Sequence, residues 1–66
     1  MNPAAKGAYY ARLFRKAGTY LGKAQQARAI SILQEGRDFA EREGDRAMAR
    51  RFAEEIARAS LPGDSE

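Results

Sequence analysis

The sequence contains no cysteine and no histidine, and these two absences restrict its chemistry. Without cysteine there is no disulfide framework, no thiol nucleophile and no zinc site of the cysteine type. Without histidine the chain lacks the commonest metal ligand and the usual general base at neutral pH. No carboxylate or lysine lies in the apolar setting that a catalytic group requires. We therefore expect a protein that is not an enzyme, holds no metal or cofactor, and takes no small-molecule substrate.

Long apolar segments are also missing from the sequence. No window approaches the roughly 18 apolar residues that a membrane-spanning helix requires. The N-terminal segment MNPAAKGAYY has no apolar run typical of a signal peptide. These features predict a soluble cytoplasmic protein that does not insert into a membrane.

Valine is absent, and the apolar residues recur at spacings of three and four, which indicates helices and no strands. We expect an all-α fold, a three-helix hairpin or bundle with short loops. Its single domain covers residues 1–60, with helices at about 3–21, 24–43 and 45–60, and residues 61–66 form a frayed tail. The apolar stripes are Tyr10, Leu13, Phe14, Ala17 and Leu21; then Ala29, Ile32, Leu33, Gly36 and Ala40, with Phe39 at the edge; then Met48, Ala49, Phe52, Ile56 and Ala59.

Residue types that favour helix ends mark most of the boundaries. Asn2 followed by Pro3 is typical of an N-cap and a first helical residue. Gly44 and Asp45 predict the end of the second helix and the cap of the third, and Gly22 is a candidate left-handed cap of the first. Residues 19–26 contain no Pro, Asp or Asn. A single bent rod of about forty residues, dimerising as a coiled coil, is therefore an alternative to two separate helices.

Two further expectations concern packing. Gly36 lies amid good helix formers, which favours a point of close helix approach over a break. The core available to 66 residues rarely supplies more than ~3–5 kcal/mol. We therefore expect additional surface to be buried in a homo-oligomer, a homodimer in the simplest case, or against a larger partner.

Charge is distributed unevenly between the two halves. Residues 1–34 hold six Lys and Arg and no acid, whereas residues 35–66 hold six Arg and nine acids. The second half contains opposite charges at four-residue spacing, which predicts ion pairs on exposed helix faces. The expected pairs are Arg37–Glu41, Asp38–Arg42, Arg50–Glu54, Arg51–Glu55 and Glu54–Arg58.

The acid-free half contains the candidate binding surface. Cationic and aromatic residues follow one flank of the first predicted helix, beside its apolar stripe, and two more arginines add charge nearby. The candidate residues are Tyr9, Arg12, Lys16, Tyr20 and Lys23, with Arg15 and Arg28 flanking them. One hypothesis is a basic surface for an acidic protein partner. The alternative is nucleic acid, with cations on phosphates and tyrosines stacked on bases. A purely structural interpretation also applies, since Tyr often borders a core stripe with its hydroxyl in water.

The spacing of these helices resembles a tetratricopeptide repeat. Leu13, Ala17 and Tyr20 match the large, small and aromatic positions of its first helix, and Ala29 and Leu33 match its second. Residues 39–49, FAEREGDRAMA, resemble the junction that leads into the next repeat. The match covers about residues 13–49. Four positions depart from the pattern: Lys16 replaces a Leu, Ala24 a turn Gly, and Gly36 an Ala, and Glu41 lies near a common Pro.

The resemblance implies a role in protein binding instead of catalysis. Such repeats need about three copies to bury a continuous core, and one and a half copies are incomplete alone. The resemblance therefore implies self-association or docking on another protein.

Overall fold

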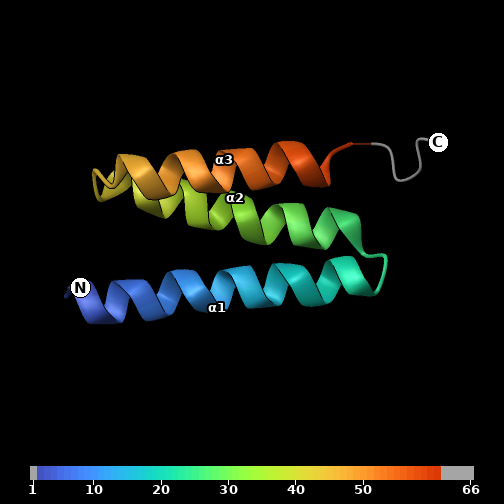
Figure 1. The fold of residues 1–66 in the computed structure, drawn as a ribbon, viewed down its shortest axis with the longest axis horizontal. Coiled ribbons are helices and arrows are strands. Elements are labelled where there is room, and N and C mark those ends of the chain that lie inside the picture. Colours follow the sequence, from blue (N-terminus) through green and yellow to red (C-terminus); the bar gives the residue numbers. More distant parts are fainter. Residues whose placement is uncertain (1, 62–66) are drawn as a thin grey trace.

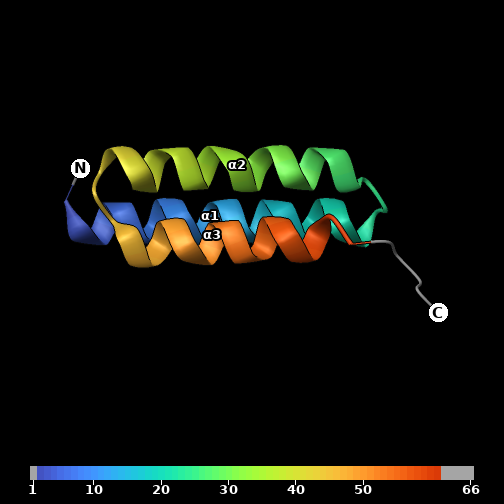
Figure 2. The same cartoon turned by 90° about the horizontal axis from the view of Figure 1, so that it is seen from above.

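The computed structural model describes residues 2–61 and shows three α-helices joined by short turns. They are α1 (Pro3–Gly22), α2 (Gln26–Arg42) and α3 (Arg46–Ala59). α1 and α3 run in the same direction and α2 runs against both (Figure 1). α1 and α3 lie on the same side of α2 (Figure 2). The all-α three-helix prediction is confirmed, and α1 and α2 are separate helices, not one bent rod. Residues 62–66 of the expected tail lie outside the described residues.

The start of α1 follows the expected cap. Asn2 has an extended backbone, and its side-chain Oδ1 accepts a hydrogen bond from the Ala5 N–H at 2.7 Å. Pro3 is the first helical residue. Its missing N–H would have had no partner within the helix, so proline costs nothing there.

The turn from α1 to α2 differs from the prediction in one residue. The left-handed position is Ala24, with φ of 61°, and Gly22 is instead the last residue of α1. The Gln25 N–H donates to the Tyr20 carbonyl at 2.8 Å, and the Ala24 N–H donates to the Leu21 carbonyl at 3.0 Å. This is the Schellman pattern of helix ending. The two hydrogen bonds place the left-handed residue two positions after the last helical one, which selects Ala24.

The turn from α2 to α3 repeats this geometry with glycine. Gly44 has φ of 72°, the Asp45 N–H donates to the Ala40 carbonyl at 2.8 Å, and the Gly44 N–H donates to the Glu41 carbonyl. The Asp45 side chain then accepts from the Met48 N–H at 3.4 Å as the cap of α3. The predicted roles of Gly44 and Asp45 are confirmed.

The core lies where the three apolar stripes meet. Its buried side chains are Tyr10, Leu13, Ala17, Ala29, Leu33, Ala40 and Phe52. Phe52 is the large fully buried residue, and its ring stacks on Phe14 with centroids 4.4 Å apart and planes 2° apart. Gly36 is buried beneath this ring, so α2 and α3 approach closely there as expected. Leu21, expected in the core, is 44% exposed, because it lies at the end of α1 beside the turn.

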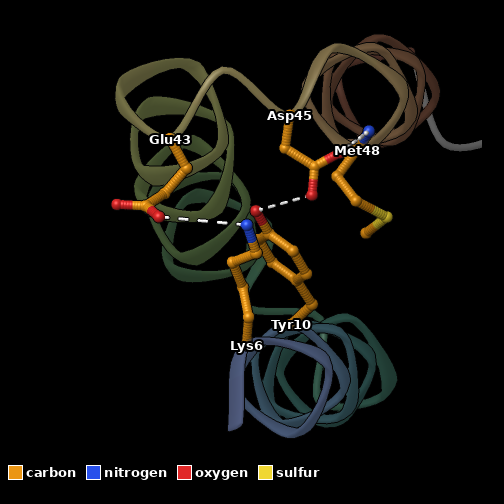
Figure 3. A network of polar contacts seen from close by, with 5 residues as sticks. All are labelled: Lys6, Tyr10, Glu43, Asp45 and Met48. Atoms are coloured by element: carbon orange, nitrogen blue, oxygen red, sulfur yellow. Dashed lines mark hydrogen bonds and ion pairs between the residues drawn. The ribbon is translucent and has the colours of Figure 1, made fainter. Parts of the chain in front are cut away.

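Polar contacts attach the α2–α3 turn to the start of α1 (Figure 3). The Tyr10 hydroxyl donates to Asp45 Oδ2 at 3.2 Å, and Lys6 Nζ lies 3.8 Å from Glu43 Oε1. Burial, followed by the negative charge of Asp45 and its hydrogen bond, raises the pKa of Tyr10 to about 12. The residue that caps α3 therefore also holds α1 in place.

The predicted four-residue ion pairs are wrong. Within residues 2–61 none of the five pairs forms. Arg37 instead contacts its neighbour Asp38 at 3.6 Å, and Arg58 reaches back three residues to Glu55 at 3.0 Å. Arg51 lies over the Phe14 ring, with its guanidinium carbon 4.9 Å from the ring centroid. The tertiary contact with α1 therefore takes Arg51 away from its helical neighbour.

Candidate functional site

Tyr9 is held within the fold by α2. Its half-buried ring packs edge-on against Phe39, with centroids 4.8 Å apart. Its hydroxyl donates to Glu35 Oε2 at 3.0 Å. Burial is the largest cause that raises the pKa of Tyr9, and the charge and hydrogen bond of Glu35 act in the same direction. Tyr9 therefore joins α1 to α2 and does not present a free aromatic face.

Tyr20 has a similar position near the other end of α1. It is half-buried against the core, and the Arg28 guanidinium lies over its ring at 5.8 Å from the centroid. The fold thus brings together two predicted site residues from different helices. A cation at this distance from an aromatic face is attracted by the ring quadrupole.

The predicted cations lie on the surface. Arg12, Arg15, Lys16, Lys23 and Arg28 are all exposed, and none forms an ion pair with a residue of the described range 2–61. Arg12 and Arg42 both lie near enough to the Tyr9 hydroxyl to lower its pKa, although burial and Glu35 outweigh them. These cations are available for an external partner.

The helix geometry separates the predicted residues into two surfaces. Arg12 and Lys16 of α1, and Lys23 directly after it, are separated by four and seven residues and so lie on one side of the helix. This is the side of Tyr9 and Tyr20, whose rings contact Phe39 and Arg28 of α2. We call these three cations, with Arg28 of α2, the basic seam. Arg15 lies apart from it, on the side of α1 that faces α3.

Arg15 lines a hollow of about 400 Å³ between α1 and α3. The other lining residues are Gly7, Tyr10, Ala11, Phe14, Met48 and Arg51. Sequence reasoning missed Met48 and Arg51 as surface residues, because their contact with α1 exists only once the three helices pack. One feature of the sequence could have indicated this contact, because Phe14 and Phe52 lie in the apolar stripes of two different helices.

A second hollow, of about 390 Å³, lies at the end of the molecule near the α1–α2 turn. Leu21 and Leu61, which are 44% and 62% exposed, both line it, together with Ala24 and Ala59. The Gln26 side-chain amide donates to the Ala59 carbonyl at its edge and joins α2 to the end of α3. The most exposed large apolar side chains of the described chain therefore share one site.

Within residues 2–61 no three acidic side chains gather in a way that could hold a metal ion. None of the three helices is long and apolar enough to cross a membrane. Comparison with protein-family models, with curated proteins and with solved structures gives no match. The geometry of the surfaces is therefore the basis for a functional conclusion.

Proposed function

We propose that this chain is a small, non-enzymatic, cytoplasmic protein-interaction module that binds an acidic surface of a protein partner through the cations of α1. The observation that carries the proposal is the charge of α1. This helix has four cationic residues and no acidic one, and a fifth cation, Lys23, follows it directly. Among its cations Lys6 alone pairs with a described carboxylate. An exposed field of one sign attracts a surface of the opposite sign and accelerates its encounter.

The packing of the tyrosines favours protein over nucleic acid as the partner. Proteins that bind single-stranded nucleic acid stack its bases on exposed aromatic side chains. Tyr9 packs against Phe39, and Tyr20 lies against the core and under Arg28. The basic seam then offers only cations, which suit a carboxylate surface and leave phosphate binding as the competing possibility.

We further propose that the module is tetratricopeptide-like, and the order of the helices supports this. Two antiparallel helices are followed by a third that is parallel to the first (Figure 1). This is the arrangement expected of about one and a half repeats. The exposed face of α3 carries Arg46, Arg50 and Glu54, and a polar outer face is typical of a terminal helix in a repeat array.

Matched charge reversals test the proposal. The first double variant is Arg12→Glu with Lys16→Glu in the basic seam. The control is Arg46→Glu with Arg50→Glu on α3, which has the same spacing and the same change in net charge. The probe is a fluorescent glutamate-rich peptide of about 20 residues, with binding followed by anisotropy. We expect the seam variant to weaken binding by about tenfold or more and the control to have a much smaller effect.

Two outcomes contradict the proposal. Equal losses in both double variants show that net charge alone governs binding. Tighter binding of a mixed-sequence duplex or single strand than of the peptide, with a steep salt dependence, assigns the seam to nucleic acid instead.

A further inference from the structure

The hollow between α1 and α3 continues toward the N-terminal end of α1. A neighbouring hollow shares three lining residues with it, Gly7, Tyr10 and Met48. The remaining residues that line this neighbouring hollow are Pro3, Lys6 and Asp45. The shared residues make the two hollows one continuous groove. We call it the α1–α3 groove.

The groove has an apolar lining, and its wall on the α1 side is formed in part by residues with small side chains. Phe14 and Met48, both half-buried, supply the large apolar surface, and Tyr10, which is 6% exposed, adds little to it. Gly7 and Ala11, one helical turn apart, supply a wall with almost no side chain, and a Cβ added at Gly7 meets nothing within 4 Å. Small residues at this spacing permit another helix to approach closely.

The charges of the groove favour an acidic occupant. Arg15 from α1 and Arg51 from α3 line it, and neither pairs with a carboxylate in the described chain. Asp45 is already engaged, because it accepts from the Tyr10 hydroxyl and the Met48 N–H. The α1 of a second copy is disfavoured as the occupant, since it has no acid to offer.

The backbone of the walls favours a helical occupant over an extended one. Because both walls are helices, their main-chain N–H and C=O groups are already hydrogen-bonded within α1 and α3. An extended peptide would find no main-chain partners there, whereas a helix satisfies its own.

We propose that the α1–α3 groove binds an amphipathic acidic helix of a partner protein. Its apolar side chains contact Phe14 and Met48, and its carboxylates meet Arg15 and Arg51. This inference rests on the proposed function and names both the groove and the form of the acidic partner.

Three synthetic peptides of about 15 residues test the groove. The first has Leu on one helical face and Glu on both flanks of that face, the second has Gln for Glu, and the third has Ser for Leu. Each is titrated into the ¹⁵N-labelled full chain by NMR, up to about 1 mM peptide. We expect saturable binding of the first peptide alone, with the largest shifts at residues of the groove.

Variants of the chain separate the groove from the basic seam. Ala11→Met fills the groove at an exposed helical position, and Ala27→Met makes the same change on an exposed position of α2. Arg51→Gln removes a groove cation. We expect Ala11→Met and Arg51→Gln each to weaken the first peptide by about tenfold or more, with Ala27→Met unchanged. Circular dichroism checks that each variant is folded.

The groove proposal is overturned if the first peptide does not saturate, if Ala11→Met binds it unchanged, or if the peptide without Leu binds equally well. Sensitivity to Arg12→Glu with Lys16→Glu in those cases leaves the proposed function standing on the basic seam. Insensitivity to every one of these substitutions overturns both proposals.

Discussion

At the scale of single residues, Ala24 and Gly44 occupy equivalent left-handed positions after α1 and α2. A side chain in this conformation costs roughly 1–2 kcal/mol, partly offset by the extra freedom that glycine has in the unfolded chain. We expect Ala24→Gly to raise the free energy of unfolding by about 1 kcal/mol and Gly44→Ala to lower it by a similar amount.

Chemical denaturation of the two variants measures both changes. A Cβ at Gly44 would meet no atom within 4 Å, so the loss there reports backbone strain and not a clash. A destabilising Ala24→Gly contradicts the argument. Ala24 lines the hollow near the α1–α2 turn, which we call the end hollow. A destabilised variant would mean that the Ala24 methyl contributes more to stability by its contacts there than its left-handed conformation costs.

Tyr10 links stability to alkaline pH. In the unfolded chain the pKa of Tyr10 has the ordinary tyrosine value of about 10, whereas in the folded protein it is about 12. The contribution is complete below pH 10 and is lost as the pH rises toward 12, because the unfolded state releases its proton first. We expect the free energy of unfolding to fall more steeply over this interval in the wild type than in Tyr10→Phe.

Urea denaturation at several pH values compares the two proteins. Parallel curves would show that the Tyr10–Asp45 contact has no influence on folding.

At the scale of the elements, α2 and α3 meet at Gly36. A Cβ at this position would lie 2.8 Å from Phe52 Cδ1 and closer still to two other ring atoms, and Phe52 is fully buried. Overpacking of this kind costs typically ~1–3 kcal/mol, more than the ~1 kcal/mol that alanine gains in helix propensity. We expect Gly36→Ala to destabilise the protein. The control is Gly18→Ala in α1, where a Cβ meets nothing within 4 Å, and it is expected to stabilise.

Thermal denaturation distinguishes the two substitutions, since a change of 1 kcal/mol shifts the melting temperature of a small domain by roughly 4–8 °C. Stabilisation by both would mean that the helices separate at Gly36 without cost.

Local signals decide which elements the sequence predicts well. Asn2 and Asp45 accept from nearby backbone N–H groups through a side-chain oxygen, and Gly44 adopts a positive φ, so their roles follow from residue type. Ala24 escaped prediction because alanine carries no signal for a left-handed conformation, and only the hydrogen bonds at the end of α1 impose it. The ion pairs failed for a related reason. Their spacing is correct for an isolated helix, but Arg51 is taken by a ring of another helix.

The candidate site was predictable only in part. The exposure of Arg12, Lys16 and Lys23 follows from their distance from the core stripe of α1. The separation of Arg15 from them, and its meeting with Arg51, depends on where α3 lies. A sequence pattern does not determine which flank of α1 a third helix occupies.

At the scale of the whole molecule, self-association stays a prediction, and the charge distribution indicates where it would occur. Contact through the middle of α1 would place like charges together. The end hollow instead combines exposed Leu21 and Leu61 with one carboxylate, Glu55, and one cation, Arg58. Glu55 and Arg58 pair with each other at 3.0 Å, so the patch has no net charge and does not repel its copy across a two-fold axis.

We therefore expect sedimentation equilibrium to show a dimer that Leu21→Gln shifts toward the monomer, because the substitution removes apolar surface from the contact. Ala27→Gln, on an exposed position of α2, is the control and leaves the dimer unchanged. A monomer at every concentration contradicts the prediction. It would leave a domain of 66 residues stable on its own small core, with the end hollow open to water.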